Sequence, residues 1–258
     1  MTDKKIKKVT LQYLLITFVV TGITWGGIYI AQRYGYLMGD SALFYPIYIF
    51  GGASSTIASF IVLVKSGMPV KEWLKNVFGL KQNPLSYLIV LLFLLCFIVL
   101  GCITKVFVLT MPLWYLVLFT FQNIFEGGLE EAGWRFILQP NLEKVMPFSL
   151  ATLATCAIWT LWHLPLFFID GTAQQNMNFG LFSIFFVGYS FSLAIIKRLT
   201  GSVWLCVLFH AALNAICSVF AVKFSLTGNI IITAVIVIIA LFLNKYKYIQ
   251  HYHVDAEE

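Results

Sequence analysis

The chain has 258 residues, of which 60% are hydrophobic and only 11% are charged, and 17 basic against 11 acidic side chains give it a net charge of +6. Soluble domains carry about a quarter of their residues as charged side chains, so this composition excludes a water-soluble globule, a disordered chain and a secreted disulfide scaffold. The five cysteines lie in or beside apolar stretches without a CxxC pair, which predicts buried thiols and neither a disulfide framework nor a zinc knuckle.

Apolar stretches long enough to cross a membrane follow one another along the chain. A bilayer core about 30 Å thick requires roughly 20 apolar residues per helix. The sequence therefore predicts an all-α polytopic membrane bundle of about eight transmembrane helices, forming a single integral membrane domain over residues 1–258. The first stretch is too long for the h-region of a signal peptide and is predicted to be retained. The predicted spans are approximately 9–31, 42–64, 85–103, 113–135, 148–168, 179–196, 202–222 and 230–244.

The basic residues predict how these spans are oriented. Cytoplasmic loops hold most of the Lys and Arg residues of a membrane protein. The eight spans put 14 of the 17 basic residues on the side of the N-terminus and leave Arg33, Lys105 and Lys223 on the other. Both termini are therefore predicted to be cytoplasmic. The lipid bilayer, with its anionic inner leaflet, is a sufficient partner for the positive charge, and no nucleic acid is expected.

The stretch 67–83, between the second and third predicted spans, mixes apolar with basic side chains. Their spacing fits a short amphipathic helix that lies on the inner leaflet. A solvated basic loop is the alternative, and the sequence leaves both open.

The fourth predicted span carries four charged residues in its later part: Glu126, Glu130, Glu131 and Arg135. An ionised side chain near the middle of a membrane helix costs about 2.5–3.5 kcal/mol, so these groups need partners or a function. Glu131 and Arg135 are four residues apart and are expected to form an ion pair. Glu126 and Glu130 would share one helical face and one sign of charge, which is typical of a site for proton transfer.

Three glycines lie beside these charges, at Gly127, Gly128 and Gly133. Small residues let another helix or an extended peptide approach closely. The alternative is that this segment only emerges into the cytoplasm and that its charges form an ordinary interfacial cluster.

Two of the four histidines lie in apolar stretches. His163 belongs to the fifth predicted span, where Trp159 shares its face, and His210 belongs to the seventh, where Asn214 lies one turn further on. Each lone histidine has a packing role as its alternative. Together with a carboxylate, however, two imidazoles and a carboxamide would form either a metal site or an acid–base site with a donor for an oxyanion.

In this order, the three segments resemble the CAAX protease and bacteriocin-processing family of intramembrane proteases, which includes the type II CAAX prenyl endopeptidases. The family pattern is EExxxR, FxxxH and then HxxxN or HxxxD on successive core helices. Here it reads EEAGWR from Glu130, WTLWH up to His163 and HAALN from His210. The resemblance covers residues 113–219, and Trp159 stands where the family usually has Phe.

The resemblance implies roles for the residues of this catalytic core. Glu130 would be the general base that activates water, and Asn214 would stabilise the oxyanion. His163 and His210 would hold the water or a metal ion. Both a site with zinc or another divalent metal and a metal-independent glutamate mechanism are left open. If Glu130 were a metal ligand, another glutamate would have to act as the base. The supporting residues would be Glu131, Arg135, Glu126 and Trp159.

The expected function is that of an intramembrane endopeptidase that hydrolyses small membrane-associated peptides or protein precursors in a bacterial plasma membrane. One alternative is a bacteriocin self-immunity protein that acts by binding. Another is a proton-coupled transporter that uses Glu126 and Glu130 as a relay, although the sequence shows no paired broken helices in two matching halves.

The expected site requires two adjustments of the predicted spans. Glu130 lies near the cytoplasmic end of its span, whereas His163 lies about 22 Å into the fifth span at 1.5 Å per residue. The two side chains would meet if the fifth span entered the bilayer near Leu153, leaving Ser149 and Thr152 wet, and if the fourth continued past Arg135.

Overall fold

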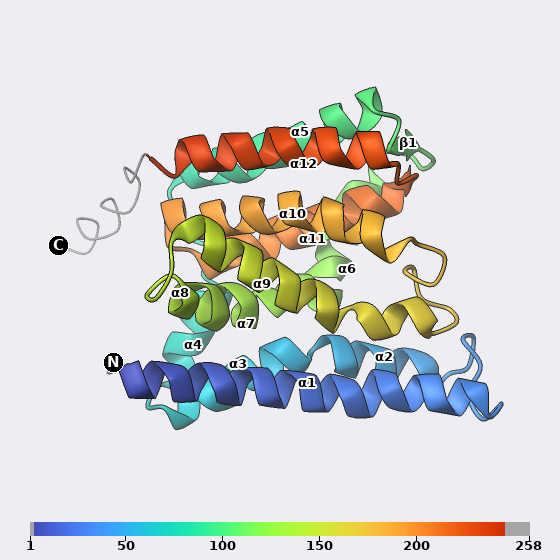
Figure 1. Cartoon of the computed structure of the whole chain (residues 1–258), viewed down its shortest axis with the longest axis horizontal. Coiled ribbons are helices and arrows are strands. Elements are labelled where there is room, and N and C mark those ends of the chain that lie inside the picture. Colours follow the sequence, from blue (N-terminus) through green and yellow to red (C-terminus); the bar gives the residue numbers. More distant parts are fainter. Residues whose placement is uncertain (1–2, 246–258) are drawn as a thin grey trace.

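The computed structural model describes residues 3–245, which form a bundle of helices lying side by side (Figure 1). This arrangement confirms the predicted all-α class. The longer helices are α1 (Asp3–Arg33), α2 (Phe44–Gly52), α3 (Ser54–Lys65), α5 (Pro84–Ile103), α6 (Tyr115–Glu126), α9 (Phe148–Trp162), α10 (Phe179–Thr200), α11 (Val203–Val219) and α12 (Leu226–Leu243). Two short antiparallel strands, β1 (Phe107–Leu109) and β2 (Phe220–Val222), pair Phe107 with Val222 and Leu109 with Phe220.

Fewer helices than expected are long enough to cross a membrane. Among residues 3–245, five pass by length and composition, and the pair α2 and α3, bent by 46°, raises the number to six. All eight predicted spans contain helix, but α11 has only 17 residues and the fourth span is broken after α6. The short α11 is an interior helix that packs against α5, α6 and α10. Its Leu205, Phe209 and Leu213 are fully buried.

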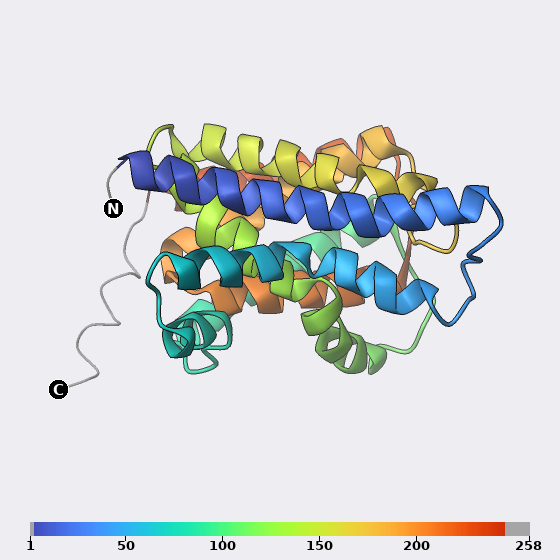
Figure 2. The same ribbon diagram turned by 90° about the horizontal axis from the view of Figure 1, so that it is seen from below.

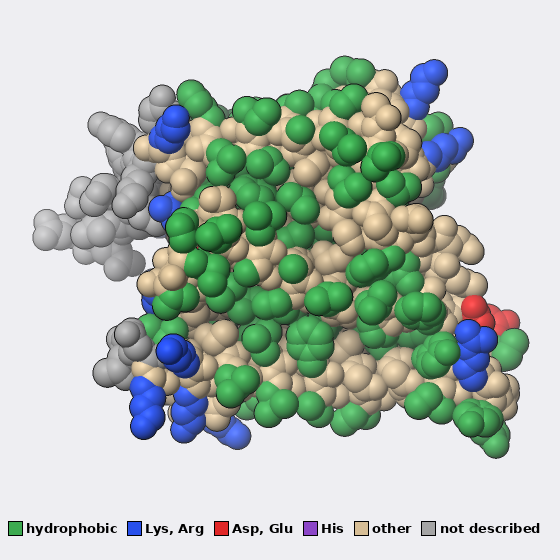
Figure 3. All heavy atoms as spheres, viewed as in Figure 1, with side chains coloured by type: hydrophobic (Ala, Val, Ile, Leu, Met, Phe, Trp, Pro, Cys, Tyr) green, Lys and Arg blue, Asp and Glu red, His purple; other side chains and the backbone are tan. Residues whose placement is uncertain are grey.

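The surface of the bundle is that of a membrane protein. Hydrophobic side chains cover the flank in Figure 3, whereas Lys and Arg side chains gather at its two ends. Helix α1 begins and α12 ends at the same end of the bundle (Figure 1), as an even number of crossings requires. The cytoplasmic location of that end stays a prediction.

The stretch 67–83 contains a helix, α4 (Val70–Val77), and is not wholly irregular. Trp73 and Val77 on this helix are buried. The Trp73 indole donates a hydrogen bond to Ser59 Oγ in α3 at 3.1 Å. The amphipathic helix expected on the inner leaflet therefore packs part of its apolar face against the protein.

All five cysteines are free, as predicted. Cys156 and Cys206 are buried, whereas Cys96 and Cys217 are half-buried. Cys102 is exposed, so the prediction of a buried thiol is wrong there. The reason is that Cys102 lies on the outer side of α5, where an apolar side chain needs lipid and not protein as its neighbour.

The fourth predicted span is not one continuous helix. After α6 the chain forms a 3₁₀ turn, η1 (Gly128–Glu130), one turn of α-helix, α7 (Glu131–Gly133), a π-helix, η2 (Trp134–Leu138), and α8 (Gln139–Leu142). Gly127 leaves helical geometry, with φ −147° and ψ −40°. A Cβ on Gly128 would lie 2.8 Å from the Val207 carbonyl oxygen of α11. The glycines thus allow the close helix approach that was predicted, and they also end α6.

The break leaves backbone carbonyls that need donors inside the bundle. Helix α3 supplies them: Ser55 Oγ donates to the Glu130 carbonyl oxygen at 2.8 Å, and Thr56 Oγ1 donates to that of Leu129 at 2.7 Å. Tyr13 of α1 lies 2.9 Å from Ser55 Oγ and extends this chain of hydroxyl groups. The second predicted span therefore holds the broken one in place.

One of the two expected adjustments is observed. Helical structure continues past Arg135 to Leu142, as predicted. Helix α9 begins at Phe148, and Thr152, which was expected to contact water, is fully buried. The Thr152 side chain does not contact solvent, and its hydroxyl accepts a hydrogen bond from Gln139 Nε2 at 3.0 Å. The depth at which the fifth span enters the bilayer stays a prediction.

Candidate active site

Trp159 links the predicted acid to both predicted imidazoles. Its indole Nε1 donates a hydrogen bond to Glu130 Oε2 at 3.0 Å. The centroid of its ring lies 5.6 Å from that of His163 and 5.4 Å from that of His210. All four side chains are buried, with at most 7% of their surface exposed. The structure therefore brings together residues from η1, α9 and α11, as the motifs predicted.

Glu130 is held through one of its two carboxylate oxygens. Besides Trp159, the Trp134 indole donates to Glu130 Oε2, at 3.3 Å. Within residues 3–245, Oε1 has no hydrogen-bond partner. Two N–H donors thus fix the orientation of the carboxylate and leave one oxygen able to accept a proton.

Glu131 forms the predicted ion pair and a second contact. Its Oε2 accepts from Arg135 Nε at 3.1 Å, and its Oε1 accepts from His210 Nδ1 at 2.8 Å. The Arg135 and Glu131 side chains have no exposed surface. Arg135 also donates to Gln139 Oε1 at 3.0 Å and to Ser190 Oγ at 2.9 Å. Buried charges are tolerated when they are paired and hydrogen-bonded in this way.

The hydrogen bonds fix the tautomers of both imidazoles. His163, at the C-terminal end of α9, has Nδ1 2.9 Å from the Trp159 carbonyl oxygen, which can only accept. His210 Nδ1 faces the carboxylate of Glu131 in the same manner. In the neutral form of each ring the proton therefore lies on Nδ1, and Nε2 is the acceptor. Neither Nε2 has a hydrogen-bond partner in the described part of the chain.

Asn214 is oriented by a residue that the motifs do not include. The Tyr189 hydroxyl of α10 donates to the His210 carbonyl oxygen at 3.0 Å and lies 3.3 Å from Asn214 Oδ1. With Oδ1 accepting from this hydroxyl, Nδ2 is the free end of the amide. A Cβ added to Gly127 would lie 2.7 Å from Asn214 Nδ2 and 3.0 Å from His210 Nε2, so both atoms face the break after α6.

Glu126 lies apart from this cluster. It is the last residue of α6, it is exposed, and its Oε1 accepts from Gln122 Nε2 at 2.8 Å. The expectation that Glu126 and Glu130 share one helical face is therefore wrong, because the helix ends between them at Gly127.

Other residues near the cluster were not found from the sequence. Trp162 of α9 donates to Thr21 Oγ1 of α1 at 2.6 Å, and Thr21 lies 2.8 Å from Ser54 Oγ of α3. Gly133 is closely covered as well, because a Cβ there would collide with Tyr13 and Ser55. The consecutive hydroxyl residues at the start of α3, inside an apolar stretch, were the signal that could have indicated a supporting role.

The fit of a metal ion can be judged from the donor atoms. In residues 3–245, no group of three or more His, Cys, Asp or Glu is arranged to hold one. The Nε2 atoms of His163 and His210 are available, but both oxygens of Glu131 are engaged, as is one of Glu130. Together with Glu130 Oε1, the two Nε2 atoms would supply three donors, the number usual for catalytic zinc, but they are not arranged as a group that could hold one ion. The metal alternative stays a prediction.

The fold and the cluster define a helical membrane protein with a buried acid–imidazole site. Residues 110–216 match the sequence profile of a family described as type II CAAX prenyl endopeptidase Rce1-like. The chain is also similar to CAAX prenyl protease 2 of Methanococcus maripaludis, with 27% identity over 225 residues that cover 78% of this chain and 81% of that protein. Both findings support the CAAX protease and bacteriocin-processing family for this chain, as the motifs predicted, and with it an intramembrane endopeptidase in general terms.

Proposed function

We propose that the chain is an intramembrane endopeptidase in which Glu130 activates a water molecule for attack on a peptide bond of a membrane-associated substrate. The proposal is carried by the gathering of Glu130, His163 and His210 around Trp159. A free carboxylate oxygen and two imidazole acceptors gathered around one indole are groups that can serve hydrolysis by water.

In the proposed step, water donates one hydrogen bond to Glu130 Oε1 and the other to a histidine Nε2. Glu130 takes a proton as the water oxygen bonds to the carbonyl carbon of the peptide. Asn214 Nδ2 donates to the oxyanion of the tetrahedral intermediate, where such a donor contributes about 10²–10³-fold to the rate. Glu130 then passes its proton to the leaving nitrogen as the C–N bond breaks, which yields a carboxyl group and an amine.

The assignment of the base to Glu130 rests on the other two acids being engaged elsewhere. Glu131 uses both oxygens to hold Arg135 and His210, so it acts as a positioning residue. Glu126 is exposed at the end of α6 and is bonded to Gln122. Its separation from Glu130 also removes the paired carboxylates on which the transporter alternative depended.

The substrate class is proposed from the relative. Its name describes a CAAX prenyl protease, so a peptide with a prenylated cysteine near its C-terminus is the first substrate to test. The unprenylated peptide of the same sequence is the matched comparison.

The test uses the full-length protein in liposomes with a fluorogenic peptide. Glu130→Gln keeps the size of the side chain but removes the base, and we expect cleavage to fall about 10²–10⁴-fold. Glu126→Gln makes the same chemical change outside the cluster and is expected to stay within a few-fold of the unmodified protein. Cleavage by Glu130→Gln at the unmodified rate would contradict the proposal, and tight peptide binding without any cleavage would favour the immunity alternative.

A chelator separates the two mechanisms that the sequence left open. We propose the metal-independent route, and therefore expect an unchanged rate after treatment with 1,10-phenanthroline and dialysis. A rate that is lost on chelation and restored by zinc would overturn this part of the proposal and assign His163 and His210 as ligands.

A further inference from the structure

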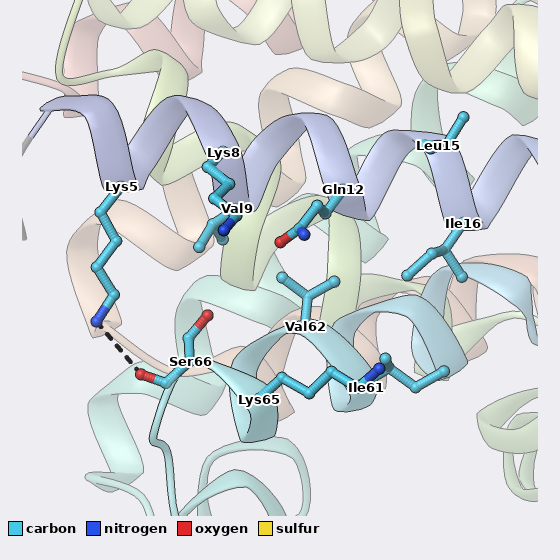
Figure 4. A pocket seen from close by; sticks show the side chains of 10 residues that line it. All are labelled: Lys5, Lys8, Val9, Gln12, Leu15, Ile16, Ile61, Val62, Lys65 and Ser66. Carbon is cyan, nitrogen blue, oxygen red and sulfur yellow. Dashed lines mark hydrogen bonds between the residues drawn. The ribbon is translucent and has the colours of Figure 1, made fainter.

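A groove of about 580 Å³ lies between the first turns of α1 and the last turns of α3. Seen from below, the two helices run side by side along this face (Figure 2). Lys5 and Lys8 reach into the groove from α1, and Lys65 lines it from α3 (Figure 4). None of the candidate active-site residues lines it, so the groove is a separate feature of the molecule.

The charge of the groove has one sign. All three lysines are exposed, and among the described residues that line the groove none is acidic. Lys5 Nζ donates to the carbonyl oxygen of Ser66 at 3.3 Å, so it lies across the mouth between the two helices. Cationic side chains on both walls favour an anionic ligand, and basic pockets between transmembrane helices suit lipid headgroups.

The inner part of the groove is mainly apolar, although the Gln12 amide lies between the lysines and Ile16 (Figure 4). Ile16 of α1 and Ile61 and Val62 of α3 line it beyond the lysines. From Lys5 to Ile16 the helix rises about 17 Å at 1.5 Å per residue, enough for a glycerol phosphate and the first part of an acyl chain. A charged mouth that continues into an apolar slot requires a ligand that is anionic at one end and a hydrocarbon at the other.

We propose that this groove binds one anionic phospholipid, with the headgroup phosphate at Lys5, Lys8 and Lys65 and one acyl chain along Ile16 and Ile61. The bound lipid fills the space between α1 and α3. These two helices also supply the hydroxyl groups that hold the backbone of η1. By stabilising the packing of α1 and α3, the lipid would therefore also stabilise the backbone of the proposed active site. This proposal does not rest on the proposed proteolysis, because lipid binding to the groove requires none of the catalytic residues.

The test measures lipid affinity of the purified full-length protein in an uncharged detergent, by native mass spectrometry and by the shift in thermal unfolding. Dioleoyl phosphatidylglycerol is the probe, and dioleoyl phosphatidylcholine is the zwitterionic comparison. At about 1.4 kcal/mol per tenfold and about 1 kcal/mol per lysine near a membrane surface, the triple variant Lys5→Gln, Lys8→Gln and Lys65→Gln should bind phosphatidylglycerol about 100-fold more weakly.

The matched control removes three lysines that do not line the groove: Lys4→Gln, Lys7→Gln and Lys71→Gln. It has the same net charge as the groove variant, and we expect it to bind within a few-fold of the unmodified protein. An equal loss in both triple variants would overturn the proposal, because it would show diffuse surface attraction and no site. Since all six lysines are exposed, both variants are expected to fold, which size-exclusion chromatography checks.

Two further experiments distinguish a phospholipid headgroup from free phosphate as the ligand. Inorganic phosphate and glycerol phosphate are expected to compete poorly, because they lack the acyl chain. Ile61→Asn should weaken the binding of phosphatidylglycerol without changing the weak binding of inorganic phosphate. Full competition by inorganic phosphate, equal binding of phosphatidylcholine, or displacement of the lipid by an acidic peptide alone would each contradict a phospholipid site.

Discussion

Trp159 contributes an N–H donor to Glu130 as well as an aromatic face to both imidazoles. A phenylalanine at this position could provide only the aromatic face. The indole fixes the carboxylate so that its second oxygen points away from Trp159 and stays available. At the scale of single residues, Trp159, which stands where the family usually has Phe, therefore also contacts the proposed base.

Trp159→Phe is expected to lower kcat about 10- to 100-fold with little change in KM. A hydrogen bond to a charged group is worth about 1.5–3 kcal/mol, and it orients a group that acts in the chemical step. Steady-state kinetics on the prenylated peptide measure both constants. Trp114→Phe changes an exposed tryptophan and serves as the control. An unchanged kcat in Trp159→Phe would mean that the indole does not position the base.

Glu131→Gln tests the buried ion pair. It would leave the Arg135 guanidinium buried without a charged partner, which costs about 3–5 kcal/mol. We expect a clear fall in the free energy of unfolding measured by denaturation in detergent micelles. Glu143→Gln is the matched change in a partly exposed pair with Arg198, and its amide oxygen can still accept from Gln139 Nε2, so about 0–1 kcal/mol is expected. Similar losses in the two variants would contradict this account.

At the scale of elements, the broken fourth span determines where the candidate active site lies. Because α6 ends at Gly127, the chain turns toward α11 and places Glu130 and Glu131 in the interior. The π-helix that follows keeps Arg135 beside Ser190 of α10. A straight helix over the same residues would keep Glu126 and Glu130 on one face.

Gly127→Ala should reduce activity about 100-fold, because a displacement of about 1 Å in a reacting group can cost that much. The new Cβ would lie 2.7 Å from Asn214 Nδ2 and 3.0 Å from His210 Nε2, and both must move. Gly26→Ala, where a Cβ would meet nothing within 4 Å, is the control. The ratio of kcat/KM between the two variants is the measurement, and a ratio near one would contradict the prediction.

The motifs predicted the acid, the histidines and the Glu131–Arg135 pair because these residues lie at fixed spacings within single segments. The break at Gly127 could not be predicted in the same way, since glycine is common in membrane helices and often only allows close packing. The hydroxyl groups that donate to the carbonyl oxygens freed by this break belong to Ser55 and Thr56, which are more than 70 positions away in the chain. Contacts of that kind depend on tertiary packing, which no local spacing records.

At the scale of the whole molecule, eight helical segments predict two cytoplasmic termini, even though among residues 3–245 only five helices are long enough by themselves and the bent pair of α2 and α3 makes a sixth candidate. The loop before α9 and the start of α12 lie at opposite ends of the bundle (Figure 1). Hydropathy and charge were sufficient to predict this arrangement. They could not show that α11 is short, because its apolar residues face protein and a sequence does not distinguish protein neighbours from lipid.

The orientation can be tested by labelling with a membrane-impermeant thiol reagent in intact cells. In a background in which the five cysteines are replaced, Lys223→Cys should react from outside, whereas Lys144→Cys should react only after the cells are permeabilised. Both positions are exposed. Labelling of both from the same side would contradict the three crossings predicted between residues 144 and 223.

The hydroxyl chain from Tyr13 through Ser55 to the backbone of Glu130 connects the first two spans to the candidate active site, although the family match begins only at residue 110. A chimera that carries the later helices behind the first two spans of an unrelated membrane protein would contain every motif residue. Without those hydroxyl groups it is expected to lose peptide cleavage, and grafting Tyr13, Ser55 and Thr56 into the foreign spans is the first step toward restoring it.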